Sequence, residues 1–234
     1  MRFTADLHVH TALSPCAVEE MTPAAIVARA LELGLDMIAI CDHNTAGNAA
    51  AVVKAADGRL AVIAGIEVTT AEEMHVVGLF PDARAAEAVG REVQATLPVQ
   101  AGTNRRLLST GCGLDLTEAV ALIHAHGGLA VAAHVDRPSF SVIAQLGFWP
   151  QDAGFDAAEI SAAGAQRLAQ GRAASLMSDS KFQIPEGLPV VCGSDAHSLD
   201  ELGAGRTMAE MEEATFDELV SALRGVGGRR CGCA

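Results

Sequence analysis

Residues that bind metal ions recur at the ends of the apolar runs in this chain. His8 and His10 close the first run, and Asp195 and His197 follow the last one with the same spacing. Side chains two residues apart on a β-strand share a face, so each pair can hold one cation. Further polar residues follow or close the apolar runs in between, at His43, Glu67, His75 and His134. This recurrence predicts one shared site and a fold that gathers strand ends.

Apolar runs of strand length alternate with helical segments along the chain. Thr22 and Pro23 form a helix start, and Gly34 is expected to end that helix. About seven strand–helix units in series are typical of a parallel barrel, whose active site lies on the loops at the C-terminal ends of the strands. We predict one α/β domain over residues 1–225, with the glycine-rich tail 226–234 flexible.

Composition narrows the class of partner. The 234 residues carry a formal net charge of −13, which repels polyanions unless metal ions locally invert the field. With no Tyr, one Trp and seven Phe, the chain has few aromatic rings on which bases could stack. The composition therefore disfavours a long nucleic acid, although it does not disfavour a small nucleotide.

The cysteines and the hydropathy pattern favour a cytoplasmic protein with no membrane partner. No apolar run reaches the ~18 residues of a membrane span, and the N-terminus lacks the zones of a signal peptide. The six cysteines form no CxxC pair, so free thiols are expected in a reducing compartment. Cys41 and Cys192 end apolar runs and are expected in the core, whereas Cys231 and Cys233 lie in the tail. The oligomeric state stays open.

Five motifs, in their order along the chain, resemble the PHP (polymerase and histidinol phosphatase) family of metal-dependent phosphoesterases. They are HxH, DHN, a Glu with a following His, AH and GSDAH, and they run from His8 to His197. The opening string from Asp6 to Cys16 is similar to a stand-alone subgroup of that family. The resemblance implies a distorted (β/α)7 barrel of the PHP type that holds two to three divalent ions (Zn, Mn or Fe).

The resemblance also divides the ligands among these ions. The first ion would be held by His8, His10, Glu67 and Asp195. Glu67 would bridge to a second ion bound by His75 and His134, and a third would be bound by His43 and His197. Some relatives add a His at the position of Cys16. A thiolate there would favour zinc or iron over manganese, or Cys16 only packs against its neighbours.

The implied reaction is hydrolysis of a small phosphorylated metabolite, such as a nucleotide or a sugar-like phosphate. Clustered cations lower the pKa of a bound water to about 7, and the resulting metal-bound hydroxide attacks phosphorus in line. A bridging Glu67 would keep two ions within ~4 Å. Asp195 or His197 would relay a proton as general acid or base. Arg137, three residues after His134, is placed to bind the phosphate.

Several polar residues near the motifs have two interpretations. Asp42 either binds metal or orients a ligand through a hydrogen bond, and Asp6 has the same choice. Asn44 positions a loop or substrate, or caps the following helix. Arg105 and Arg106 either reach inward as a lid or belong to a solvated face.

His124 and His126 form a further HxH string that we exclude as a metal site. They fall in the last turn of an expected helix, where side chains two residues apart diverge by about 200°. A polar or cationic side chain is favoured at a helix C-terminus in any case.

Two other functions are considered. An amidohydrolase-type enzyme that cleaves C–N bonds also begins with HxH after its first strand. Dinuclear versions bridge their metals with a carboxylated Lys at a strand end, a place that neither Lys54 nor Lys181 occupies and Glu67 does. A non-catalytic metal-binding module would be expected to have lost several ligands, whereas this chain departs at most at Cys16.

Overall fold

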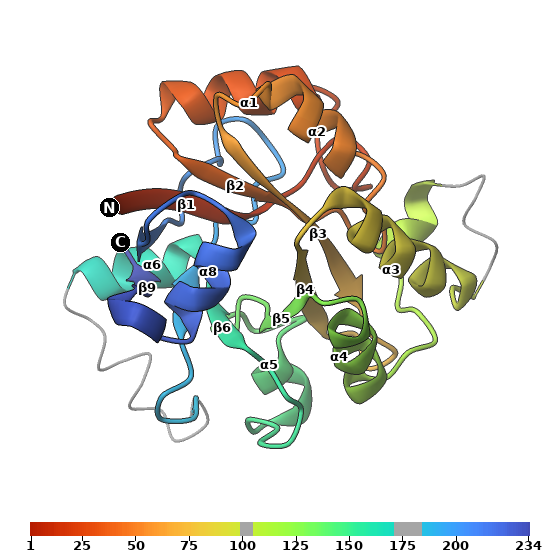
Figure 1. The fold of residues 1–234 in the computed structure, drawn as a ribbon. Helices are drawn as coiled ribbons and strands as arrows, with labels where there is room; N and C mark the ends of the chain where they lie inside the picture. The colour runs from red at the N-terminus through yellow and green to blue at the C-terminus, as the bar shows by residue number, and fades with distance from the viewer. Residues whose placement is uncertain (99–104, 171–183) are drawn as a thin grey trace.

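The computed structural model describes residues 1–98, 105–170 and 184–234. Its strands form one curved sheet in the order β7-β6-β5-β4-β3-β2-β1-β8-β9, with the helices arranged around it (Figure 1). The strands are β1 (Arg2–Val9), β2 (Met37–Ile40), β3 (Ala61–Thr69), β4 (His75–Phe80), β5 (Leu129–Ala132), β6 (Ala157–Ile160), β7 (Val190–Cys192), β8 (Thr207–Glu210) and β9 (Arg230–Cys233). The predicted α/β barrel-type fold is confirmed.

The helix expected to begin at Thr22 and Pro23 and to end at Gly34 is among the observed helices. They are α1 (Pro23–Glu32), α2 (Ala49–Ala56), α3 (Ala83–Ala95), α4 (Leu116–Ala125), α5 (Val142–Leu146), α6 (Ala162–Ala169) and α8 (Phe216–Leu223), with short 3₁₀ turns η2 (Arg105–Ser109) and η3 (Val226–Gly228). Thr22 caps α1 by accepting a hydrogen bond from Ala25 N, and Gly34 follows the helix with a positive φ. The sequence pattern also predicts a helix over residues 163–177; α6 forms its first part, and residues 171–177 lie outside the described residues.

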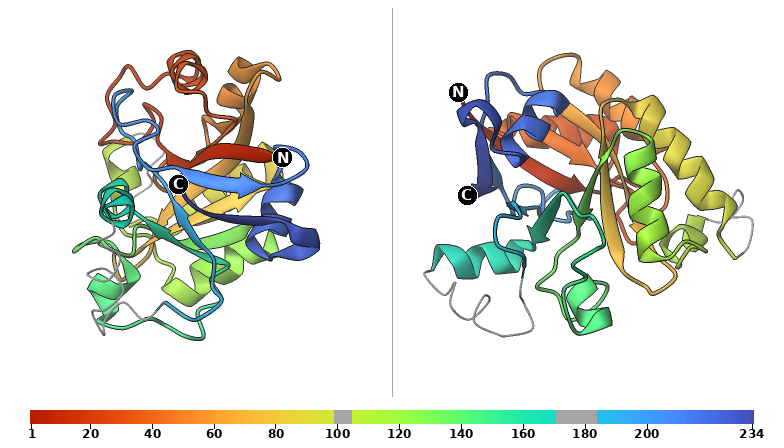
Figure 2. Two further views of the ribbon diagram at one scale, coloured as in Figure 1. Left: turned by 90° about the vertical axis from the view of Figure 1, so that its left-hand side faces the viewer. Right: turned by 60° about the horizontal axis from the view of Figure 1, so that its bottom comes forward.

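The sheet closes on itself where the chain leaving β7 meets β1. Val9 pairs in parallel with Ala196, and His10 N donates a hydrogen bond to Ala196 O at 3.0 Å. A second bridge pairs His43 with Glu67 and extends the contact between β2 and β3. The two views in Figure 2 show the resulting nearly closed barrel. The chain ends of β1, β2, β3 and β7 therefore meet at one mouth.

Strand β4 runs against both of its neighbours, which corrects the expectation of an all-parallel barrel. It pairs antiparallel with β3, from Ala64 opposite Phe80 to Thr69 opposite His75, and antiparallel with β5. Only residues 70–74 connect β3 to β4, whereas a parallel crossover needs a dozen residues or more. His75 therefore begins its strand instead of closing it, and this reversal is what brings it to the mouth beside Glu67.

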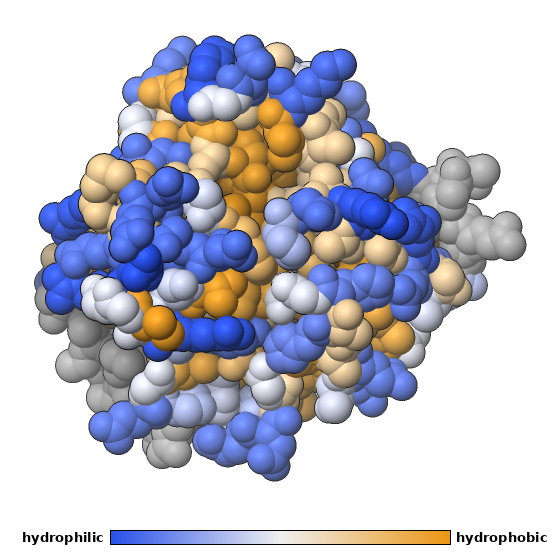
Figure 3. Space-filling model, in the orientation of Figure 1, coloured by the Kyte–Doolittle hydropathy of each residue, from blue (hydrophilic) through white to orange (hydrophobic). Residues whose placement is uncertain are grey.

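Two apolar layers hold the barrel. Inward-facing side chains such as Ala5, Leu7 and Val131 form one core cluster, to which Leu219 and Leu223 of α8 contribute. The outer layer packs α1 and α2 against β1 and β2, and α3 and α4 against β3, β4 and β5. On the face of the molecule seen in Figure 3, hydrophilic residues cover much of the surface, and a strip of apolar residues shows between them. Among the described residues, no helix is long and apolar enough to cross a membrane.

The C-terminal tail is part of the sheet, unlike the flexible segment expected from its composition. Arg230–Cys233 forms β9, which pairs antiparallel with β8. Cys233 is disulfide-bonded to Cys192 at the end of β7, across 41 residues of sequence. This bond corrects the expectation that the cysteines are free thiols. Composition cannot show it, because the pairing arises only when β9 adds to the sheet edge. Cys41 is a fully buried free thiol, as predicted.

Candidate metal centre

Six histidines and two carboxylates meet at the mouth of the barrel. They are the residues that the sequence singles out, namely His8, His10, His43, Glu67, His75, His134, Asp195 and His197. All are buried except His197, which is partly exposed. Glu67 is fully buried, so its carboxylate has exchanged water for these neighbours.

The Glu67 carboxylate lies at the centre of the cluster. Its Oε1 lies 2.7 Å from His75 Nδ1 and 3.3 Å from His134 Nε2. Its Oε2 lies 2.8 Å from His43 Nδ1. The Nε2 atoms of His8 and His10 each lie 3.4 Å from a Glu67 oxygen. Each carboxylate oxygen thus faces a different set of imidazoles, which is the arrangement a carboxylate bridging two cations requires.

The donor atoms fit divalent cations. Glu67 Oε2 and His43 Nδ1 lie close together, yet both lack a hydrogen bond, as does His134 Nδ1. A buried polar atom without a hydrogen-bond partner costs free energy. A cation bound between these atoms would accept a lone pair from each of them, which a single proton cannot do. Burial opposes ionisation of Glu67, but the charges of His75, His43 and His8 hold its pKa well below the ordinary value. Imidazole and carboxylate donors suit Zn²⁺, Mn²⁺ or Fe²⁺.

Among the described residues, the donors fall into three overlapping groups, and within each group the ligand atoms lie within 4.8 Å of one another. The first contains His8, His10, Glu67 and Asp195, the same four residues that the family resemblance assigns to the first ion. The second contains His43, Glu67 and His75. The His134 Nε2 atom lies 3.2 Å from His75 Nδ1, so this side of the cluster also includes the other histidine of the implied second ion.

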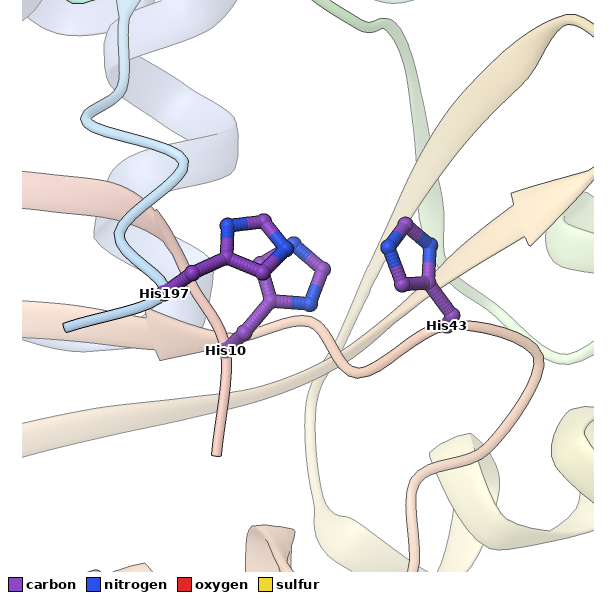
Figure 4. A group of neighbouring side chains, drawn as sticks. All are labelled: His10, His43 and His197. Atoms are coloured by element: carbon purple, nitrogen blue, oxygen red, sulfur yellow. The ribbon is translucent and has the colours of Figure 1, made fainter. Parts of the chain in front are cut away.

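The third group consists of His10, His43 and His197 (Figure 4). The rings of His10 and His197 stack with their centroids 4.1 Å apart, and His43 faces them from the loop after β2. Cys16 lies beside this group and interacts with His197 and His43. Burial opposes ionisation of this thiol, but the two imidazoles lower its pKa to about 6. The exposed Cys16 thiol thus lies beside the third group but is not one of its donors.

A carboxylate that our sequence reasoning missed lies behind the histidines. Glu159 on β6 is buried, and its Oε2 accepts a hydrogen bond from His8 Nδ1 at 2.9 Å and from His134 N at 3.2 Å. Because His8 donates from Nδ1, its Nε2 lone pair is directed to the cluster. The available signal was a Glu inside an apolar strand, the same signal that identified Glu67.

Asp42 orients a ligand and lies outside the three donor groups. Its Oδ1 accepts hydrogen bonds from Thr11 N at 2.7 Å and from Ser14 Oγ at 2.6 Å. Ser14 Oγ in turn lies 2.8 Å from His10 Nδ1. The Ser14 hydroxyl donates its proton to Asp42, so its oxygen accepts a hydrogen bond from His10 Nδ1. Because the proton of His10 is then on Nδ1, its Nε2 presents a lone pair to the cluster.

Asp6 and Asn44 hold the polypeptide near the site. The carboxylate of Asp6 accepts hydrogen bonds from the backbone N–H groups of Ser194 and Gly203. Asn44 donates to the carbonyls of Leu108 and Thr110, and its Oδ1 accepts from Thr69 N. Asn44 therefore positions a loop and does not cap α2.

The arginines differ in what they contact. Arg137 forms an ion pair with Asp195, and its side chain is 38% exposed. It also lines a cavity of about 360 Å³ together with Arg167. Arg105 braces the loop that carries Ser14, because it donates to the carbonyls of Leu13, Ser14 and Ala17. This contact differs from the inward reach considered for Arg105.

The excluded pair lies away from the cluster, as predicted. His124 faces Asp156 at 2.8 Å and His126 faces Glu92 at 2.9 Å, both near the surface. Of the two lysines, Lys54 is exposed on α2 and Lys181 lies outside the described residues. Lys54 therefore does not bridge metals as the amidohydrolase alternative requires.

Known proteins with a similar sequence or fold include two nucleases and an amidohydrolase. A 5′-3′ exoribonuclease of Haemophilus influenzae is 36% identical over 78 residues, which cover 32% of this chain and 27% of that protein. A lesion-specific endonuclease from Pyrococcus furiosus shares the fold with a TM-score of 0.73 at 21% identity, over 99% of this chain and 58% of that one. An amidohydrolase from Chromobacterium violaceum matches with a TM-score of 0.61 at 22% identity, over 85% of this chain and 89% of that one. This chain therefore spans under two thirds of the first two proteins.

These similarities contradict the expectation that a long nucleic acid is disfavoured. Endonuclease Q, solved with a 27-mer duplex that has an abasic lesion at the active site, shares this fold with a TM-score of 0.71 at 20% identity, over 98% of this chain and 58% of that one. That expectation was wrong because it used the net charge of −13, which is a sum over all residues of the chain. Binding of a polyanion depends on the local potential at the site, which cations and arginines set.

The family resemblance is confirmed by two sequence matches. The PHP domain family matches residues 6–140, which contain the motifs from His8 to His134. The PHP-associated family matches residues 185–225, which contain Asp195 and His197. The chain therefore belongs to the PHP domain family.

Proposed function

We propose that this chain is a metal-dependent phosphoesterase that hydrolyses phosphodiester bonds of nucleic acids. One observation carries the proposal: the fully buried Glu67 carboxylate lies among five imidazoles and has an oxygen without a hydrogen bond. Support for the substrate class comes from the exoribonuclease and the endonuclease that this chain resembles.

Bound divalent cations would supply charge neutralisation at the phosphate and acidify a water molecule. We assign their ligands to His8, His10, His43, Glu67, His75, His134, Asp195 and His197, with Cys16 beside the third group. Glu159 and Asp42 fix the tautomers of His8 and His10, so both rings present Nε2 to the cations.

Arg137 and Asp195 would work as a pair. The Arg137 guanidinium binds the Asp195 carboxylate, and guanidinium groups bind phosphate with the same geometry. When a substrate phosphate takes over Arg137, Asp195 Oδ2 loses its counterion and becomes more basic. Asp195 Oδ2 is therefore our choice for accepting a proton. His197 Nδ1 faces the carbonyl oxygen of Asp195 at 2.8 Å, which leaves its Nε2 to hold a cation or a proton.

The direct test is metal-dependent cleavage of defined substrates. Purified protein is stripped with a chelator and reloaded with Mn²⁺, Zn²⁺ or Fe²⁺, then supplied with single-stranded RNA, single-stranded DNA and a duplex containing an abasic site. We expect cleavage of at least one of these that the chelator abolishes and His10→Ala removes. His124→Ala, a surface histidine variant, is the matched control and should retain activity. Release of phosphate from nucleoside monophosphates alone would contradict the nucleic-acid assignment.

Metal content tests the central carboxylate separately. Glu67→Gln replaces the anion with a neutral amide that cannot bridge two cations, so most bound metal and activity should be lost. Elemental analysis of the purified variant measures this. A normal metal content in Glu67→Gln would contradict the bridging assignment.

A further inference from the structure

Phe140 presents an exposed aromatic ring at the edge of the metal centre. Its ring stacks on the His75 imidazole, with centroids 4.8 Å apart and planes inclined by 24°. The residue is 39% exposed, although Phe is usually buried. His75 Nδ1 in turn lies 2.7 Å from Glu67 Oε1. One side chain therefore separates this ring from the carboxylate at the centre of the site.

The backbone, and not burial, sets the position of this ring. Phe140 has a φ of 57°, in the left-handed region that bulky residues rarely occupy. Its carbonyl accepts a hydrogen bond from His75 N at 2.8 Å, and the next residue, Ser141, caps α5. Strained backbone of this kind concentrates at functional sites.

The loop that follows β5 carries three different functional groups. His134 belongs to the cluster around Glu67, Arg137 contacts Asp195, and Phe140 covers His75. The loop is ordered by its own hydrogen bonds, since Arg137 N donates to His134 O and Ser141 Oγ donates to Arg137 O. The loop thus places the Arg137 guanidinium, which can bind phosphate, and the flat apolar ring of Phe140 beside the same metal centre.

We propose that Phe140 is a stacking platform for the nucleobase next to the phosphate held at the metal centre. This inference rests on the proposed function. In a nucleotide, one sugar separates the base from the phosphate. A nucleotide whose phosphate lies at the metal centre would therefore bring its base to the edge of the site where Phe140 lies. Stacking on an aromatic side chain accepts every base, because every base has a flat π-face. The platform would let an acidic chain with few aromatic residues hold nucleic acid without reading its sequence.

The test measures stacking directly. Metal-loaded protein is titrated with a phosphorothioate-protected single-stranded oligonucleotide whose terminal base is the fluorescent analogue 2-aminopurine, since stacking quenches this base. A second oligonucleotide of the same length has an abasic terminal residue. The variants are Phe140→Leu and Phe140→Trp, with Phe148→Leu as the control because Phe148 is 60% exposed outside this loop. Metal content and circular dichroism verify that each variant is folded.

We expect quenching with the wild-type chain, Phe140→Trp and Phe148→Leu, and its loss with Phe140→Leu. Affinity for the base-containing oligonucleotide should fall about tenfold in Phe140→Leu, whereas affinity for the abasic one should not change. Absence of quenching in the wild-type chain, or equal loss for both oligonucleotides, would overturn the platform. This readout is binding, so it separates a failure of the platform from a failure of the hydrolysis that the cleavage assay measures.

Discussion

Glu159 on β6 holds two residues of the metal centre at once. Its Oε2 accepts a hydrogen bond from the His8 ring at 2.9 Å and from the backbone N–H of His134 at 3.2 Å. These residues come from β1 and the end of β5, which are not neighbours in the sheet. A single buried carboxylate therefore fixes both the orientation of one proposed ligand and the backbone that carries another.

Replacing this carboxylate should weaken metal binding without removing a ligand. In Glu159→Gln the side chain keeps its shape, but the His8 Nδ1 proton loses its charged acceptor. We expect metal affinity to fall about 10- to 100-fold, as measured by competition with a chromogenic chelator. Glu92→Gln, at an exposed ion pair with His126, is the control. Equal affinities in both variants would show that Glu159 does not tune the site.

A methyl group at position 193 should also weaken metal binding, because it would collide with Glu159. A Cβ built there would collide with the Glu159 carboxylate and lie 2.7 Å from His8 Cβ. We expect Gly193→Ala to lower the free energy of unfolding by about 1–3 kcal/mol and to reduce metal affinity. Gly232→Ala, where a Cβ would meet nothing within 4 Å, should be neutral by thermal unfolding. Two equal melting temperatures would refute the predicted collision.

Cys16 should react as a thiolate near neutral pH when metal is removed. Burial opposes ionisation of this thiol, but its interactions with His197 and His43 outweigh burial and lower its pKa to about 6. The reactive form is therefore the major one above pH 6. We expect iodoacetamide to alkylate Cys16 with a midpoint near this pH and metal loading to protect it, as followed by peptide mass spectrometry. Burial raises the pKa of Cys41, which should stay unmodified and serves as the internal control. Unchanged metal stoichiometry and rate in Cys16→Ser would limit Cys16 to packing.

The disulfide between Cys192 and Cys233 should stabilise the fold only under oxidising conditions. It closes a loop with a sequence separation of 41 and fastens β9 to the end of β7. Constraint of the unfolded chain by such a loop is worth about 2–4 kcal/mol. Without reductant, we expect Cys233→Ser to lower the free energy of unfolding by that amount. With reductant, its free energy of unfolding should equal that of the wild-type chain. Cys231→Ser, which removes a free thiol, should behave as wild type in both.

Residue type and order were sufficient to predict which side chains gather at the mouth. The C-terminal ends of neighbouring parallel strands lie at the same edge, so the recurrence of such residues at the ends of apolar runs predicted one shared site for His8, His10 and Asp195. Helix starts such as Thr22 with Pro23 were equally local, because a cap depends on a few adjacent residues. These features use short-range geometry, which the order of residues determines directly.

Contacts between distant segments were decided only by the tertiary structure. The reversal of β4 follows from its short connection to β3, and it determines from which direction His75 reaches Glu67. The pairing of Cys192 with Cys233, the support of His8 by Glu159 and the contact of Arg137 with Asp195 each join residues far apart in the chain. The expectation about nucleic acid failed for the same reason. Net charge is a sum over all residues, whereas recognition of a polyanion depends on where the charges lie in the folded protein. Spacing in the sequence therefore determined the donors, and packing determined what each donor faces.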